Sequence, residues 1–184
     1  MSRIHPSESP ENLDKKSQIL WNKLKAFFTG AKNIVIIAIG NEMRRDDGIG
    51  IAIFKKLKDL GPLPSPFLLL NTGTTPENFI RPIESWNPSH LLIIDAVDMG
   101  EEPGEIELIQ MDEIHNITVS THKMSLALLN KYLMSELKLK IKFLGIQIKD
   151  VSFGEGLSPE LTQIPTRVAQ LLRSILNEIT HHPI

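Results

Sequence analysis

The sequence contains no cysteine among its 184 residues. This absence excludes disulfide bonds, thiolate zinc sites, iron–sulfur clusters and a cysteine nucleophile. Long apolar runs are also missing, since none approaches the roughly 20 residues that a membrane-spanning helix needs. The N-terminus carries charge where a signal peptide would have its apolar stretch. We therefore expect a cytoplasmic protein with no membrane insertion.

An excess of positive charge is lacking as well, because the formal net charge is -2. Proteins that bind nucleic acid usually present a concentrated basic face, so we expect no nucleic-acid partner. Hydrophobic residues make up 41% of the chain and charged residues 23%, which is typical of a folded globular protein and not of a disordered one. The length suits one compact domain. Oligomeric state is not predicted by any of these features.

Amphipathic helices alternate with buried strands along the chain. The spacing of apolar residues predicts helices over 13–28, 48–60, 76–83, 125–137 and 159–179 and strands over 33–39, 67–70, 90–94, 104–110 and 142–148. The alternation predicts a three-layer α/β/α fold with a mostly parallel, twisted central sheet of about five strands. The exposed pattern of 104–110 suits an edge strand, which could be antiparallel.

This pattern predicts that the chain divides into three parts. Residues 1–30 are predicted to be an N-terminal extension that is partly helical. Residues 31–180 are predicted to form a single α/β domain, and residues 181–184 a tail. The histidine pair at 181 and 182 lies near the chain end, where a terminal tail is a better interpretation than a ligand pair.

Polar residues follow several of the predicted strands. Asp46 and Asp47 come after the first strand, Asp95 comes directly after the apolar run 90–94, and His122 lies further along the chain. Ligands in open parallel sheets bind beyond the carboxyl ends of the strands. One imidazole and two carboxylates from separate strand ends could form a site for nickel, zinc or a similar cation.

Each of these residues also has an interpretation without catalytic function. Asp46 or Asp47 could cap the helix that begins near residue 48. His122 could be an ordinary surface or core histidine, and Asp98 could be a solvated loop carboxylate with no acid–base role. For Asp95 a functional role is the favoured interpretation, because burying a carboxylate near the sheet without a partner is costly.

Several common site patterns are absent from the sequence. The glycines after the first strand do not form the dinucleotide-binding pattern, and there is no Walker lysine motif. Neither H-E-x-x-H nor G-x-S-x-G occurs. Dinucleotide cofactors and the usual zinc-peptidase and serine-hydrolase arrangements are therefore not expected.

Three motifs together resemble the hydrogenase maturation endopeptidase family. They are Gly40-Asn-Glu-Met-Arg-Arg-Asp-Asp-Gly-Ile-Gly50, Leu91-Leu-Ile-Ile-Asp95-Ala96 and Thr121-His-Lys-Met124. The stretches 95–109 and 143–147 are most similar to the branch that serves the formate-hydrogenlyase (hydrogenase 3) type of enzyme. In loop 71–75, Gly73 matches a family glycine at a turn or close backbone approach, while Gly40 and Asn41 are interpreted as turn formers.

The resemblance implies an endopeptidase that cuts the C-terminal peptide from the precursor of a [NiFe] hydrogenase large subunit after nickel has been inserted. It implies that Asp47, Asp95 and His122 contact the metal and that Asp47 and Asp95 take part in catalysis. Nickel would then be supplied by the precursor, and other divalent cations could take its place. Asp47 stands where part of the family has glutamate, and the neighbouring Asp46 could share or replace its role.

Two other functions remain open from the sequence. One is a nickel-binding assembly factor that docks on the precursor without cutting it. The other is an aminopeptidase or generic hydrolase on a similar scaffold, because a fold alone does not fix a function.

Overall fold

The computed structural model describes residues 13–111, 118–119, 132 and 139–181. The strands are β1 (Ile34–Ile39), β2 (Phe67–Gly73), β3 (His90–Asp98), β4 (Ile106–Gln110), β5 (Thr118–Val119) and β6 (Lys140–Gln147). The helices are α1 (Lys15–Phe28), α2 (Ile49–Asp59), α3 (Ile80–Trp86) and α5 (Ile164–His181). Three short 3-10 turns are η2 (Arg45–Gly48), η3 (Pro76–Phe79) and η5 (Pro159–Leu161).

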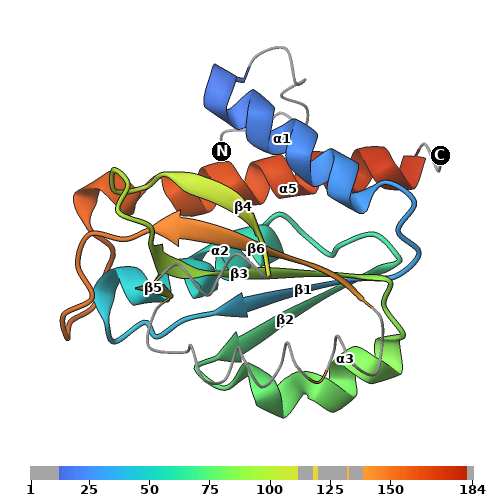
Figure 1. Cartoon of the computed structure of the whole chain (residues 1–184), viewed down its shortest axis with the longest axis horizontal. Coiled ribbons are helices and arrows are strands. Elements are labelled where there is room, and N and C mark those ends of the chain that lie inside the picture. The colour runs from blue at the N-terminus through green and yellow to red at the C-terminus, as the bar shows by residue number, and fades with distance from the viewer. Residues whose placement is uncertain (1–12, 112–117, 120–131, 133–138, 182–184) are drawn as a thin grey trace.

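The central sheet has the strand order β2-β1-β3-β6-β4 (Figure 1). Neighbouring strands are parallel from β2 to β6, whereas β4 runs antiparallel to β6 at the edge. The chain places β2 on one side of β1 and then returns to place β3 on the other side. β1 and β3 therefore lie side by side at the centre of the sheet. The predicted sheet, including its edge strand, is confirmed, and the two-residue β5 beside β3 is an addition that the sequence pattern did not predict.

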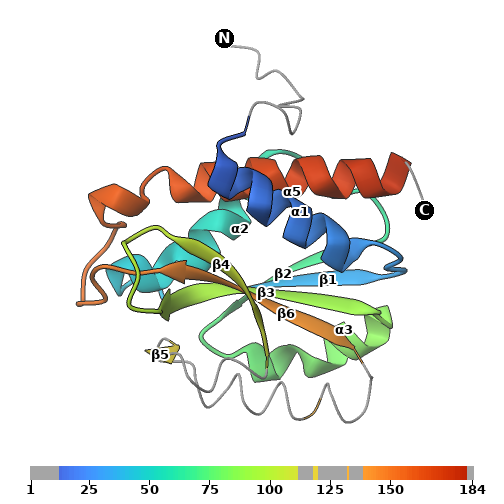
Figure 2. The same cartoon turned by 45° about the horizontal axis from the view of Figure 1, so that its top comes forward.

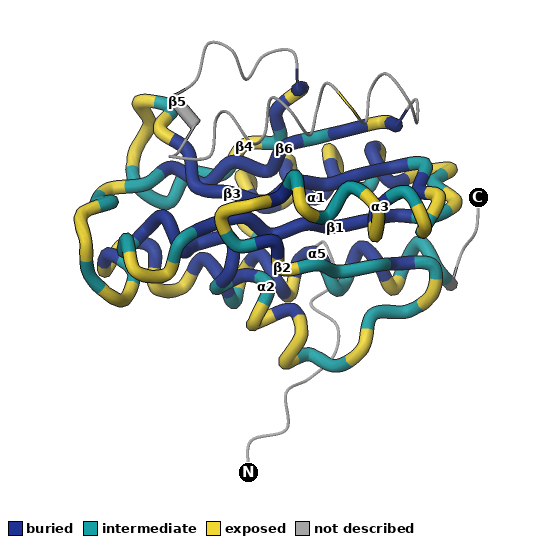
Figure 3. The backbone as a smooth tube through the Cα atoms, turned by 90° about the horizontal axis from the view of Figure 1, so that it is seen from below, coloured by how far each residue is buried: buried dark blue, intermediate teal, exposed yellow. Residues whose placement is uncertain are grey.

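Helices cover both faces of the sheet and make three layers (Figure 2). On one face α1, α2 and α5 pack against the strands through one apolar cluster, and on the other face α3 packs through a second cluster. Every residue of β1 is buried (Figure 3), because the strand is covered on both sides. This explains the continuous β-branched run in its sequence.

Two strands are longer than the sequence pattern predicts. β3 continues past residue 94 to Asp98, because β6 pairs with it as far as Val97. β2 continues through the segment 71–73, which was expected to be a turn, because Gly73 still pairs with Ile39 of β1. The predicted helix over 125–137 falls outside the described residues apart from Tyr132.

The N-terminal helix α1 is packed into the main core. Asp14 caps it by accepting a hydrogen bond from the Ser17 N–H at 3.0 Å, and Leu24 and Phe28 are fully buried against the layer that contains α5. The helix therefore shares the apolar core of the α/β layers. Within the described part of the chain, no helix combines the length and the apolar character that crossing a membrane requires.

Candidate functional site

The first candidate loop begins where β1 ends, and it folds back on itself through Gly40. Gly40 has φ 152, and a Cβ atom there would lie 2.3 Å from the carbonyl oxygen of Asp47. The N–H of Asn41 donates to that same oxygen at 3.1 Å. A side chain at residue 40 would break this close approach, so glycine fixes how Asp47 is presented.

Helix α2 then approaches the sheet very closely at Gly50. A Cβ atom at Gly50 would lie 2.2 Å from the carbonyl oxygen of Ile39 and 2.8 Å from that of Ile94. The first turn of α2 therefore sits directly over β1 and β3, and the preceding turn η2 contacts β3. This packing places the segment that carries Asp47 beside the strand that carries Asp95.

Asp46 is fully buried and is a structural anchor. Its Oδ2 accepts hydrogen bonds from the N–H groups of Lys149 (3.0 Å) and Asp150 (2.9 Å) and from the Ser158 hydroxyl (2.7 Å). Its Oδ1 accepts a fourth bond, from the Ser158 N–H, at 2.7 Å. Four donors occupy this carboxylate, so Asp46 ties the loop after β1 to the segment 149–158.

The helix-capping interpretation of the aspartate pair does not fit the geometry. The N-cap residue of α2 is Gly48, which makes no side-chain capping hydrogen bond. Asp46 and Asp47 lie in the preceding turn η2. Asp46 points to the 149–158 segment, and the assignment of Asp47 to the candidate site stays a prediction.

Asp95 lies inside β3 and not beyond its end, which corrects the position predicted from the sequence. It is fully buried and in register with Gly145 of β6, and its Oδ1 accepts a hydrogen bond from the N–H of Ala96 at 2.7 Å. Side chains alternate along a strand, so Asp95 points to the same face as Ile93 and Val97, the face that α3 covers. Asp47 is also fully buried. The structure thus brings the elements carrying two of the three predicted site residues together.

His122 lies outside the described residues, so the predicted trio of Asp47, Asp95 and His122 stays a prediction. In the ranges that the structure describes, no group of three or more histidine and carboxylate side chains is placed to hold a metal ion. Asp47 and Asp95 are the predicted ligands among the described residues, and carboxylate oxygens are donors that suit a divalent cation.

Asp98 is an exposed residue at the end of β3. Its Oδ1 accepts hydrogen bonds from the N–H of Gly100 at 3.2 Å and from Nε2 of Gln147 at 3.1 Å. The same buried Gln147 accepts a bond from the N–H of Met99 at 2.7 Å. Asp98 therefore shapes the loop after β3, which agrees with its interpretation as a loop carboxylate.

Gly73 ends β2 next to the first candidate loop. It has φ 54, and its carbonyl oxygen accepts a hydrogen bond from the N–H of Gly40 at 3.0 Å. The side chain of Asn71 accepts a bond from the N–H of Gly73, also at 3.0 Å. The carboxyl ends of β1 and β2 thus lie together, and Ile94 of β3, the residue before Asp95, pairs with Ala38 of β1.

The segment 149–158 also belongs to the site region, although no sequence motif indicated it. Arg45 forms an ion pair with Asp150 at 3.2 Å and a hydrogen bond to the Ser152 hydroxyl at 3.2 Å. Hydrogen bonds from Ser152, together with the Arg45 charge, hold the pKa of Asp150 below its usual value. No sequence signal joins Asp150 and Ser152 to Arg45, because more than a hundred positions separate them.

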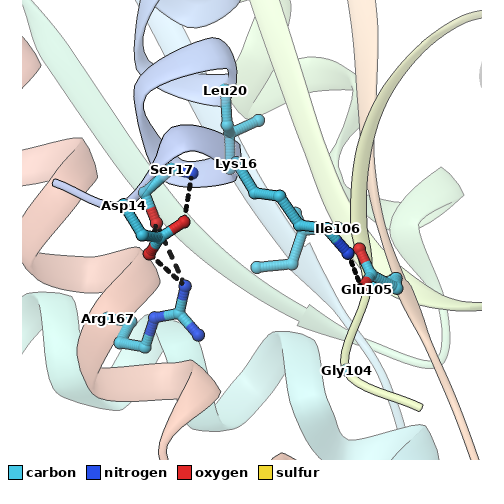
Figure 4. A pocket seen from close by; sticks show the side chains of 8 residues that line it. All are labelled: Asp14, Lys16, Ser17, Leu20, Gly104, Glu105, Ile106 and Arg167. Carbon is cyan, nitrogen blue, oxygen red and sulfur yellow. Dashed lines mark hydrogen bonds and ion pairs between the residues drawn. The ribbon is translucent and has the colours of Figure 1, made fainter. Parts of the chain in front are cut away.

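An open hollow of about 230 Å³ lies elsewhere, between the start of α1, the start of β4 and α5 (Figure 4). Its charged side chains are already paired: Arg167 contacts Asp14 at 3.3 Å, and Lys16 pairs with Glu105. The hollow is on the α1 and α5 side of the sheet, whereas Asp95 points to the α3 side. It holds none of the predicted site residues.

Similarity to known proteins supports the family resemblance. A family model described as hydrogenase maturation protease matches residues 51–178. A Methanocaldococcus jannaschii protein named as a candidate hydrogenase maturation protease is 34% identical over 168 residues, which are 88% of this chain and 96% of that protein. The hydrogenase 3 maturation protease of Escherichia coli K12 is 38% identical over 123 residues, 65% of this chain and 75% of the relative.

Solved structures agree with the sequence relatives. The crystal structure of the [NiFe] hydrogenase maturation protease HycI from Thermococcus kodakarensis has a TM-score of 0.76 at 30% identity and covers 84% of this chain and 99% of that one. The solution structure of the endopeptidase HycI from Escherichia coli has a TM-score of 0.66 at 34% identity, with 75% and 87% covered. The predicted fold and the predicted hydrogenase 3-type branch are both confirmed. The chain belongs to the hydrogenase maturation protease family.

Proposed function

We propose that this chain is the endopeptidase that removes the C-terminal peptide from the nickel-loaded precursor of a [NiFe] hydrogenase large subunit in the cytoplasm. The observation that carries the proposal concerns two fully buried carboxylates, Asp47 and Asp95. They lie on elements, η2 and β3, that contact each other toward the carboxyl ends of the central strands. In a chain of this family, that end of the sheet is where the scissile peptide would bind.

The nickel in this proposal belongs to the substrate. Asp47, Asp95 and His122 would contact a nickel ion that the cysteines of the precursor already hold, which suits a protein without thiols of its own. Bound there, a divalent ion polarises the scissile carbonyl or its attacking water. Zinc or another divalent cation would substitute if the contacts are only carboxylate oxygens and one imidazole.

The carboxylates would accept and donate the protons that are transferred during hydrolysis. Water adds to the scissile carbonyl carbon while Asp47 or Asp95 accepts a proton from it, and the proton passes to the leaving amine as the C–N bond breaks. A buried carboxylate beside the reacting water suits this role, because little bulk water competes for it.

Mass spectrometry of a purified precursor incubated with the protein tests the proposal. We expect loss of one C-terminal peptide from the nickel-loaded precursor and no loss from the nickel-free precursor. The absence of cleavage in both, with the precursor still bound, would instead favour a non-cutting assembly factor. Release of residues from short unrelated peptides would favour a generic hydrolase.

A further inference from the structure

Two large apolar side chains are exposed next to the candidate site. Met43 is 57% exposed in the loop after β1, and Phe153 is 78% exposed in the segment 149–158. The two loops lie against each other, since the N–H of Gly154 donates to the carbonyl oxygen of Met43 at 2.8 Å and the N–H of Arg45 donates to that of Gly154 at 2.9 Å. Residues distant in sequence thus present their apolar groups from adjoining backbones.

The pair of loops is firmly fastened. Besides the four hydrogen bonds to the Asp46 carboxylate, the N–H of Asp46 donates to the carbonyl oxygen of Asp150 at 3.1 Å. Arg45 adds its ion pair with Asp150. Met43 and Phe153 are therefore held out to solvent by a pre-organised frame, which lowers the entropic cost of binding a partner through them.

This frame also holds the candidate catalytic carboxylate. The N–H of Asp47 donates to the carbonyl oxygen of Arg44 at 3.0 Å, which closes the turn between Met43 and Asp47. A peptide that reaches Asp47 must approach this same loop. Met43 lies in the same loop as Asp47, and Phe153 lies in the segment bonded to that loop.

We propose that Met43 and Phe153 form a docking patch that binds an apolar segment of the precursor close to the scissile bond. This inference rests on the proposed function and names a specificity surface for it. A flexible thioether and an aromatic ring are side chains that often dominate binding at such surfaces. Arg45 and Glu42 beside the patch are already paired, with Asp150 and Lys55, so we expect the patch to favour apolar residues of the precursor over charged ones.

The double variant Met43→Ser/Phe153→Ser tests the patch, with Ile19→Ser as the matched control. Ile19 is 48% exposed on α1, on the opposite side of the sheet from Asp95. We expect the double variant to raise KM for the nickel-loaded precursor by about tenfold or more with kcat nearly unchanged. The control should keep both constants, and the thermal midpoints of all three proteins should agree, because the altered side chains are exposed.

Precursor binding to each protein, measured by surface plasmon resonance, separates failure of this inference from failure of the proposed function. If the wild type cuts the precursor and the double variant cuts it with unchanged KM, the docking patch is wrong and the peptidase function stands. If the wild type binds without cutting, weaker binding by the double variant still supports the patch, whereas equal binding overturns it. Loss of self-association with unchanged precursor binding would assign the patch to a second copy of this chain and overturn the inference. No precursor binding by the wild type would overturn it as well.

Discussion

The two ends of the parallel sheet both bury ionisable side chains, yet they treat them differently. At the carboxyl ends of the strands, Asp46 is fully buried and receives four hydrogen bonds. At the opposite end, His90 begins β3 with 3% of its surface exposed. Its Nδ1 lies 2.8 Å from the Ser89 hydroxyl and its ring packs edge-on against Phe27 at 5.1 Å, while among the described residues Nε2 has no hydrogen-bond partner.

Burial of an ionisable group is therefore not by itself a mark of function. Burial, with a smaller effect from the Lys140 charge, lowers the pKa of His90, so the core holds a neutral imidazole as a largely apolar group. At the carboxyl ends, four hydrogen bonds hold the buried carboxylate of Asp46, and its buried neighbour Asp47 is the predicted site residue. The supply of donors and the position in the sheet distinguish the two cases.

The largest expected effect comes from removing a candidate site group. Asp95→Ala and His122→Ala should each lower processing of the nickel-loaded precursor by roughly a thousandfold or more while the fold is retained, because each removes a group proposed to contact the metal or the reacting water. Rates from electrophoretic band shifts and circular dichroism spectra provide the measurement.

Asp98→Asn is the matched control for this test, since Asp98 is an exposed carboxylate at the end of β3, the strand that carries Asp95. It should process the precursor within about twofold of the wild type. Normal maturation by both Asp95→Ala and His122→Ala would overturn the assignment of the site.

Removing the anchor should affect stability more than chemistry. Asp46→Ala leaves three backbone N–H groups and the Ser158 hydroxyl without their acceptor, so we expect the free energy of unfolding to fall by about 3 kcal/mol. Urea denaturation measures this. Glu160→Ala, which breaks an exposed ion pair with Lys149, should leave it nearly unchanged, and equal losses in the two variants would contradict the anchoring role.

The close approach of α2 can be broken with a single methyl group. Gly50→Ala places a Cβ atom against two strand carbonyls, and we expect about 2 kcal/mol of lost stability and slower processing, because η2 must move away from β3. Gly61→Ala, at φ 98 in open space, should cost about 1 kcal/mol and leave processing unchanged. Thermal unfolding and the processing assay together test whether Gly50 sets the geometry.

The smallest expected effect is the pH dependence that His90, at the amino end of β3, gives to the free energy of unfolding. Because the pKa of His90 in the folded protein is below its ordinary value of 6.5, the unfolded chain binds the proton more readily. His90 therefore does not reduce the free energy of unfolding above pH 6.5. The free energy of unfolding falls as the pH drops from 6.5 toward the pKa of His90 in the folded protein, with a slope of at most about 1.4 kcal/mol per pH unit. His90→Gln should remove this part of the slope in urea titrations between pH 5 and 7, and an unchanged slope would contradict it.

Much of the fold could be predicted from periodicity alone. Strands such as β1 are covered on both faces, and that burial is written locally as an unbroken apolar run. The extension of β3 to Asp98 could not be seen this way, since it depends on pairing with β6 some fifty residues later. Strand ends are fixed by such partners and not by their own composition.

The candidate site was predictable only in part for a related reason. Position at a strand end indicated Asp47 and Asp95, but nothing local distinguished Asp46 from Asp47. The distinction arises from donors at residues 149, 150 and 158, which only the folded chain brings near. The contribution of His122 stays a prediction.

The bond between Asp46 and Ser158 spans 112 positions of the chain, and this has a consequence for synthesis. A ribosome completes the Gly40–Gly50 motif early, but the Asp46 carboxylate lacks its four hydrogen-bond donors until the segment 149–158 has emerged. Domains fold as units once their distant contacts can form. A nascent or truncated chain that ends before residue 149 would thus carry the whole first motif and still lack the segment that anchors it. We therefore expect proteolytic competence to arrive only with the last fifth of the protein.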